Sequence, residues 1–394
     1  MKILFYRYGS ICEPDLIEVF ERLGLEVEEE TAEIYRKDIL PLDGLNLIRN
    51  RVQDHPEQYS FAFSINFFPW LSDVCNAYHM IYISLIVDSP VLELYSKSIR
   101  NPYNRVFLFD RMLYNEFAPK NPACVFHIPL ATNQQRNEQV IAAASVAQKQ
   151  HFQSEVSFIG SLYSEKCPFN KAKLPEYEAG FSAGLIEAQL KVYGYNFIEE
   201  TLSNDFVKVF MNSTPGVYRF PPNCEENYRA VVAQQYISVK VAEQERIRAL
   251  KLLSDRFDVD IYTGSDTSMM PHIHNRGFAK SMTEMPLIFN RSKINLNITA
   301  KSIRSGLSLR IFDVLGCGGF LLTNYQAELP EFFEPGVDLE TYSSMEELED
   351  KVTYYLTHDT ERERIAQTGC EKIRRLHTYD TRVLQMLQFV YPPA

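Results

Sequence analysis

Residues 305–325, SGLSLRIFDVLGCGGFLLTNY, decide the fold class. The stretch predicts a polar loop, one short helix, a glycine turn and a β-strand. Backbone N–H groups at a helix start are free, and the helix dipole adds partial positive charge there. Because Gly306 has no side chain to keep a ligand away, the loop predicts either close packing alone or a phosphate-bearing ligand at the helix start.

Short apolar runs followed by helical stretches recur along the chain. Residues 2–8 predict a strand and residues 13–23 a helix, with apolar side chains three and four positions apart. Further apolar runs lie at residues 60–68, 80–87, 105–109 and 124–130. Runs that are apolar on both faces are typical of parallel strands covered by helices. Residues 1–155 are therefore expected to form a Rossmann-like, doubly wound α/β domain.

A second α/β domain is expected over residues 156–375, with a helical insertion at 176–255. Its strands are predicted at residues 155–160, 258–264, 293–298, 319–324 and 339–343. Helices are predicted at residues 133–153, 345–356 and 360–376. Residues 376–394 predict a last helix that crosses back to the first domain. We expect a deep cleft between the domains, because strand-end loops of both halves carry the candidate residues.

Composition excludes several function classes. The chain of 394 residues has a net charge of −11, whereas general nucleic-acid binders normally have a basic excess. The seven cysteines form no C-x-x-C pair, which indicates free thiols in a reducing compartment. The longest apolar run, at residues 80–87, is too short for a transmembrane segment, and Arg7 interrupts the only signal-like start. We therefore expect a soluble, cytoplasmic protein without a nucleic-acid partner.

Ligands of open α/β sheets bind at the carboxyl ends of the strands, so the residues that follow each predicted strand are the first candidates. Gly9 follows the first strand, Lys166 ends the loop after the first strand of the second domain, and Gly264 follows the next one. Asp88 is the acid of the first domain best placed for a catalytic role. A turn or N-cap position before Pro90 explains Asp88 equally well.

Several other polar residues are weaker candidates. Asn66 and Asn133 also follow apolar runs, and His127 is better explained as a sheet histidine than as a base. His272 and His274 suggest a metal ligand pair, but no cysteine or acid cluster completes such a site. We expect no metal.

Positive charge is concentrated next to the opening stretch. Residues 276–310 contain seven basic side chains and Glu284 as their only acid. The basic residues are Arg276, Lys280, Arg291, Lys293, Lys301, Arg304 and Arg310. A solvated basic face explains this pattern as well as an anion site does. The free N–H groups of the adjoining loop favour the anion.

Arg310 and Asp313 lie three residues apart and hence on one face of the predicted helix. They form either a surface pair or a binding pair, in which Arg310 clamps a phosphate and Asp313 accepts hydrogen bonds from ribose hydroxyls. The glycines that end the helix are better explained by packing than by ligand contact.

Residues 255–323 resemble the donor half of group 1 (family 4) GT-B glycosyltransferases. That family has a glutamate, seven residues and a second glutamate before a small-residue turn, and here Ser305 and Asp313 fall on the two positions. The loop FIGSLYSEK resembles the family's Gly-Arg-Leu…Glu-Lys loop. Lys166 falls on its diphosphate-binding lysine, and Ser161 stands in place of its arginine.

A closer resemblance is to the spore-maturation-protein (CgeB-like) glycosyltransferases. It rests on the runs VDSPVLELYSKSI, HIPLATN, SFIGSLY, GLIEAQLKVYGYNFIEE, IRSGLSLRIFDVLGCGGFLLTNYQAELPEFFEPG and HTYDTR, and covers residues from about 60 to 385. The resemblance implies a GT-B fold and transfer of a sugar from a nucleotide diphosphate sugar to an unidentified acceptor, with retention and without a metal.

Ser305 cannot take the role of the family's glutamate on the donor sugar, and Ser161 leaves the implied diphosphate site one cation short. Arg310 is expected to supply that cation, with Arg304 as the second choice, beside the backbone of Gly306 and Leu307. Two alternatives remain: a non-catalytic nucleotide-sugar- or glycan-binding protein on the same fold, and a nucleotide-sugar epimerase. The sequence identifies neither the sugar and base nor the acceptor.

Overall fold

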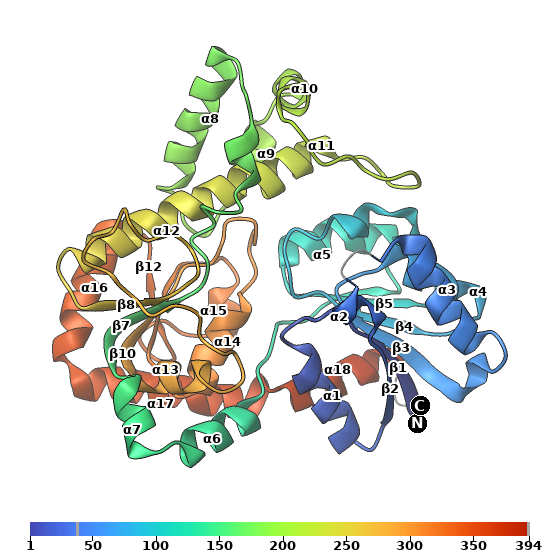
Figure 1. Cartoon of the computed structure of the whole chain (residues 1–394), viewed down its shortest axis with the longest axis horizontal. Coiled ribbons are helices and arrows are strands. Elements are labelled where there is room, and N and C mark those ends of the chain that lie inside the picture. Colours follow the sequence, from blue (N-terminus) through green and yellow to red (C-terminus); the bar gives the residue numbers. More distant parts are fainter. Residues whose placement is uncertain (37–38, 392–394) are drawn as a thin grey trace. The chain divides into compact units, whose positions relative to one another are not determined.

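The computed structural model describes residues 1–36 and 39–391 (Figure 1). The chain divides into two compact units, each built on a parallel sheet. The first unit comprises Met1–Leu130, Arg219–Glu226 and the chain from Tyr379 onward, and the second comprises Ala131–Tyr218 and Asn227–Thr378. The expected pair of parallel-sheet α/β domains is confirmed.

In the first unit the strands lie in the order β2-β1-β3-β4-β5-β6, and all neighbouring strands are parallel. Their bounds are β1 Lys2–Tyr6, β2 Glu26–Glu30, β3 Tyr59–Ile65, β4 Tyr82–Leu85, β5 Asn104–Leu108 and β6 Val125–His127. Phe61, Phe63 and Ile65 of β3 are fully buried, and so is Ser64 between them. This matches a central strand covered on both faces.

The helices of the first unit connect these strands. They are α1 Glu13–Arg22, α2 Ala32–Tyr35, α3 Pro41–Val52, α4 Pro69–Ala77, α5 Arg111–Phe117 and α18 Tyr379–Val390, with shorter 3₁₀ turns η1 Pro56–Gln58, η2 Leu92–Tyr95, η3 Lys97–Arg100 and η4 Ala118–Lys120. The last helix, α18, contacts α1, and Arg22 Nη2 lies 2.7 Å from Asp380 Oδ2. The carboxyl-terminal helix thus belongs to the first unit.

The edge strand β2 has the sequence EVEEE, which the sequence analysis does not predict as a strand because glutamate disfavours strands. Basic side chains of the same unit compensate for its charge. Lys2 Nζ lies 2.8 Å from Glu28 Oε2, and Arg51 lies 2.6 Å from Glu28 and 2.7 Å from Glu30. Tertiary ion pairs therefore stabilise a strand that local propensity does not favour.

In the second unit the strands lie in the order β12-β11-β10-β7-β8-β9, again all parallel. Their bounds are β7 Ser154–Ile159, β8 Val259–Tyr262, β9 His274–Asn275, β10 Ser292–Asn297, β11 Leu321–Asn324 and β12 Glu340–Tyr342. The core between this sheet and its helices includes Val156, Ile261, Ile294 and Leu322. Its strands fall where the sequence predicts them, apart from the short β9.

The helices of the second unit are α6 Gln134–Ala143, α7 Val146–His151, α8 Glu176–Gln189, α9 Ile198–Thr201, α10 Asn204–Ser213, α11 Tyr228–Ala230, α12 Ser238–Ser254, α13 Met285–Arg291, α14 Leu309–Gly316, α15 Leu329–Phe332, α16 Met345–Thr357 and α17 Asp359–Leu376, with the 3₁₀ turn η5 Pro168–Lys171. Residues 133–153, predicted as one helix, form α6 and α7. The break is explained by a capping box, in which Ser145 and Gln148 each bond to the other's backbone N–H. Because α6 and α7 contact α13, the second unit begins at Ala131 rather than at residue 156.

The predicted helical insertion contains α8 to α12. A π-helical segment, Val231–Ile237, joins α11 to α12, while α8 and α16 both pack on α12 (Figure 1). The segment Arg219–Glu226 belongs instead to the first unit, where the backbone N–H of Glu225 donates to Tyr95 O over 2.8 Å. None of the helices formed by the described residues has the length and apolar character needed to cross a membrane.

Candidate active site

The carboxyl ends of β7, β8, β10 and β11 meet at one edge of the second sheet, which is where open α/β sheets bind ligands. Hydrogen bonds join the loops that follow these strands. The N–H of Leu162, after β7, donates to Ser265 Oγ, after β8, over 2.8 Å. The hydroxyl of Ser305, after β10, donates to Glu328 Oε1, after β11, over 2.6 Å. The loops therefore form one connected polar edge.

The loop after β7 contains two of the predicted residues. Ser161 Oγ donates to Glu165 Oε1 over 2.7 Å and accepts from the N–H of Tyr163 over 2.8 Å. Lys166 is exposed, and its Nζ lies 5.2 Å from the centre of the Tyr163 ring. The loop thus presents one aromatic ring and one lysine.

Arg246 of α12 also reaches this loop. Its guanidinium donates to Ser161 O over 2.6 Å and to Ile298 O over 2.7 Å, so that it joins the loops after β7 and β10. The same group lies 4.6 Å from the centre of the Tyr163 ring. Because Arg246 lies in the helical insertion, 85 residues from Ser161, no local pattern marks it as part of the edge.

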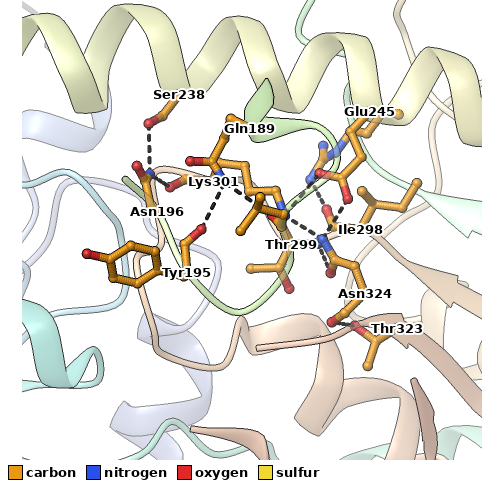
Figure 2. Close-up of polar contacts among 12 residues, drawn as sticks. Gln189, Tyr195, Asn196, Ser238, Glu245, Ile298, Thr299, Lys301, Thr323 and Asn324 are labelled. Carbon is orange, nitrogen blue, oxygen red and sulfur yellow. Dashed lines mark hydrogen bonds and ion pairs between the residues drawn. The ribbon is translucent and has the colours of Figure 1, made fainter. Parts of the chain in front are cut away.

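A buried polar network supports the loop after β10 (Figure 2). Glu245 of α12 is 0% exposed, accepts from Asn324 Nδ2 over 3.1 Å, and lies 3.7 Å from Lys301 Nζ. Asn324, at the end of β11, also accepts from the N–H of Thr299 over 2.9 Å and donates to Thr299 O over 3.1 Å. Lys301 also lies 4.5 Å from the centre of the Tyr193 ring.

The network continues into the insertion. Asn196 Nδ2 donates to Lys301 O over 2.6 Å and to Ser238 Oγ over 3.1 Å (Figure 2). Gln189 Nε2 donates to Tyr195 O over 2.8 Å, which holds the turn that carries Asn196. The loop after β10 is therefore fixed by α12 and by the turn after α8, both parts of the insertion.

Arg310 and Asp313 lie on one face of α14, as their spacing predicts, 3.7 Å apart. Asp313 Oδ1 accepts from Thr132 Oγ1 over 2.9 Å, and the Arg310 guanidinium lies 5.1 Å from the centre of the Phe289 ring. Burial raises the pKa of the Asp313 carboxyl, and the charge of Arg310 opposes that shift. Both side chains thus have partners within the second unit.

The positive charge of residues 276–310 is largely neutralised in the structure. Six of the seven basic side chains lie within 4.0 Å of a carboxylate. The pairs are Arg276–Asp260, Lys280–Glu284, Lys293–Glu155, Lys301–Glu245, Arg304–Glu199 and Arg310–Asp313. Five of these acids come from outside the stretch, so the local charge excess overstates the field that a ligand would meet.

The other predicted residues of this edge lie in different surroundings. Gly306 and Leu307 are buried, and the Ser305 hydroxyl is occupied by Glu328. Gly264 is exposed, but a Cβ at this position would meet the ring of Phe278 at 2.2 Å. A side chain at this position would therefore require the exposed ring of Phe278 to move.

In the first unit, Asp88 follows β4, is exposed, and accepts from Asn66 Nδ2 over 2.7 Å. Asn66 also donates to the Tyr8 hydroxyl over 2.9 Å. Burial and the charge of Asp88 raise the pKa of the Tyr8 phenol. The N–H of Gly9 donates to Glu13 Oε1 over 3.0 Å. Asp88 is thus an oriented, accessible carboxylate, whereas the Gly9 N–H already has a partner.

Two of the weaker candidates have structural positions. Asn133 caps α6, because its side chain accepts from the N–H of Arg136 over 3.1 Å. His127 is the last residue of β6, and the centre of its ring lies 6.1 Å from the ring centre of Tyr114 in α5.

Solved structures resemble the whole chain. HepE from Anabaena, in complex with UDP and glucose, is 11% identical, with 99% of each chain covered and a TM-score of 0.51. Sucrose-phosphate synthase from Thermosynechococcus elongatus is 9% identical, with 99% of this chain and 98% of that chain covered and a TM-score of 0.56. The fold is GT-B. A glycosyltransferase from Rickettsia africae is 11% identical, with 100% of this chain and 99% of that chain covered and a TM-score of 0.51.

Sequence comparison finds a family match over part of the chain. Residues 242–388 match a family described as glycosyl transferase-like. An uncharacterized protein of Aquifex aeolicus is 26% identical over 106 residues, and the match spans 26% of this chain and 25% of that protein. The family match and the GT-B fold together support a glycosyltransferase.

Proposed function

We propose that this protein transfers a glycosyl unit from a nucleotide diphosphate sugar to an acceptor hydroxyl, with retention at the anomeric carbon. The observation that carries the proposal is that the glycosyl transferase-like match, residues 242–388, includes the loop after β10, the start of α14 and Arg246. We place the chain in the CgeB-like subgroup, on the runs quoted above. The described cysteines are all free, which supports a reducing, cytoplasmic setting.

The proposed reaction exchanges one bond at the anomeric carbon. The bond from that carbon to the β-phosphate oxygen breaks, and its electron pair leaves with the nucleoside diphosphate. The acceptor oxygen bonds to the same carbon, and its proton passes to the departing phosphate and then to solvent. Fixed cations and backbone N–H groups at the sheet edge stabilise the charge on the diphosphate, so the proposal needs no metal ion.

The proposal gives each candidate side chain one role. Lys166, exposed on the loop after β7, contacts the diphosphate, and Asp313 accepts from the ribose. Arg310, with Arg304 as the second choice, is the cation expected from the sequence. Asp88, oriented by Asn66, contacts the acceptor hydroxyl.

Release of nucleoside diphosphate from a panel of nucleotide sugars tests the proposal. UDP-glucose is the first donor to try, because HepE binds it in a solved complex of the same fold. We expect time-dependent release that survives added EDTA. Binding without release would indicate a nucleotide-sugar-binding protein instead, and conversion of one nucleotide sugar into another would indicate an epimerase.

A further inference from the structure

Arg246 is held in place by groups that leave its charge uncompensated. Its two hydrogen bonds go to carbonyl oxygens, Ser161 O and Ile298 O, one from each of two strand-end loops. Carbonyl groups orient a guanidinium without neutralising it, and each terminal nitrogen of arginine carries two N–H bonds. One donor on each nitrogen therefore remains for a further acceptor.

Lys166 is the second cation of the same loop. Lys166 Nζ lies 5.2 Å and the Arg246 guanidinium 4.6 Å from the centre of one ring, Tyr163, so at most about 10 Å separates the two charges. In the described part of the chain, neither Lys166 nor Arg246 lies within ion-pair distance of a carboxylate. The basic residues of 276–310 differ, since six of the seven are paired.

Two like charges held close together, neither with a carboxylate at ion-pair distance, favour binding of an anion beside them. Against the effect of burial, the charge of Lys166 helps to lower the pKa of the nearest acid in sequence, Glu165, but this carboxyl accepts its hydrogen bond from Ser161. Burial lowers the pKa of the Arg310 guanidinium, and the charge of Arg246 adds to that effect, so Arg246 also lies within electrostatic reach of α14. Arg310 itself has Asp313 at 3.7 Å and the Phe289 ring as neighbours. Of the two arginines, Arg310 has a carboxylate within ion-pair distance, whereas Arg246 is bonded only to carbonyl oxygens.

We propose that Arg246 and Lys166 together bind the diphosphate group of a nucleoside diphosphate or of its sugar conjugate. The guanidinium that the loop lacks at Ser161 is supplied by α12, and it lies against the Ser161 carbonyl itself. The inference rests on the proposed function for the identity of the ligand, but the anion site stands on its own contacts. Arg246 replaces Arg310 as the partner of Lys166.

Titration of the full chain with inorganic pyrophosphate, UDP and UMP tests the proposal. Pyrophosphate probes the anion site whatever base the enzyme prefers. Arg246→Gln should weaken pyrophosphate and UDP binding on the order of 10- to 100-fold, the loss expected for charge-assisted hydrogen bonds, and change UMP binding far less. Arg246→Lys should recover only part, because a point charge does not reproduce the planar fork.

Two further variants make the test decisive. Lys166→Gln should show the same loss of preference for diphosphate, and its exposed position means that the fold should be retained even where Arg246→Gln unfolds the protein. Arg248→Gln is the matched control, since Arg248 lies two residues further along α12, is exposed and pairs with Glu187. It should bind all three ligands as the unchanged protein does.

The outcomes separate this inference from the proposed function. If Lys166→Gln and folded Arg246→Gln keep the full preference for diphosphate, or if Arg310→Gln alone abolishes it, the inference is wrong even where the protein releases UDP from UDP-glucose. If pyrophosphate binds through Arg246 but no nucleotide sugar is turned over, the anion site stands and the transferase proposal fails. If the unchanged protein binds neither pyrophosphate nor any nucleoside diphosphate, both fail.

Discussion

Asp313 accepts a hydrogen bond of 2.9 Å from the hydroxyl of Thr132, a residue 181 positions away in the sequence. Its other oxygen lies 3.7 Å from Arg310. Asp313→Ala should therefore lower the free energy of unfolding by about 1–3 kcal/mol, because two polar groups lose their partner. Asp313→Asn, which can still accept from Thr132, should recover part of the loss in urea unfolding.

The proposed ribose contact predicts a second effect of Asp313→Ala. UDP and UMP binding should both weaken, by on the order of 1–3 kcal/mol, whereas pyrophosphate, which has no ribose, should bind unchanged. Titration calorimetry below the melting temperature of the variant measures all three. Normal UDP affinity in a less stable Asp313→Ala protein would show that the residue only joins α14 to the segment before α6.

The ion pair of Glu245 and Lys301 predicts a large stability change, because both side chains are almost fully buried, at 0% and 5% exposed. Glu245→Gln keeps an acceptor for Asn324 but leaves the Lys301 charge uncompensated, which should cost about 3–5 kcal/mol. Adding Lys301→Met should restore much of the loss, since the buried charge is then removed. If Glu245→Gln alone and Glu245→Gln with Lys301→Met were equally stable in urea unfolding, this account would be wrong.

Gly319 lies where the chain passes from α14 to β11, and it has no room for a side chain. A Cβ there would meet Phe289 O at 2.4 Å and Asn295 Nδ2 at 2.7 Å. Gly319→Ala should therefore destabilise the protein by about 1–3 kcal/mol. The matched control is Gly180→Ala on α8, where a Cβ meets nothing within 4 Å and should stabilise the helix by about 0.5–1 kcal/mol. In thermal melting, Gly319→Ala should lower the melting temperature and Gly180→Ala should raise it.

Acid should destabilise the edge strand β2 through Glu28. Burial acts to raise the pKa of this carboxyl, but hydrogen bonds from Lys2, Tyr59 and Arg51 outweigh it and lower the pKa below its ordinary value of 4.5. A lowered folded-state pKa contributes stability above pH 4.5 that is lost as the pH falls through the folded value. In urea unfolding between about pH 6 and pH 3, Glu28→Gln should be less stable than the unchanged protein at pH 6, and the difference should shrink in acid.

Most of the fold could be predicted from short-range patterns. The apolar runs that became β3, β4, β10 and β11, and the helical spacing of α16, α17 and α18, are visible within a few residues of sequence. A strand or helix buries the side chains that its own period places on one face, so the pattern is local. The edge strand β2 is the exception, because Lys2 and Arg51 lie outside the window that would reveal its ion pairs.

Only part of the candidate site could be predicted from the sequence. The loop with Ser161 and Lys166, the start of α14 and the Arg310–Asp313 face follow from motif spacing alone. The sequence also indicates a basic stretch at 276–310, but it cannot show that four of the neutralising acids come from distant parts of the chain. Charge partners are chosen by packing, since Coulomb interactions depend on distance in space rather than along the chain.

The sequence alone therefore determined the two parallel-sheet domains and indicated the strand-end loops of the second domain as the candidate site. Only the tertiary structure decided which charges remain available there. Packing of the insertion brings Arg246 against the Ser161 carbonyl across 85 residues and buries Glu245 beside Lys301. Local periodicity specifies elements because each buries its own face, whereas the electrostatics of a site depend on side chains that meet only when those elements pack.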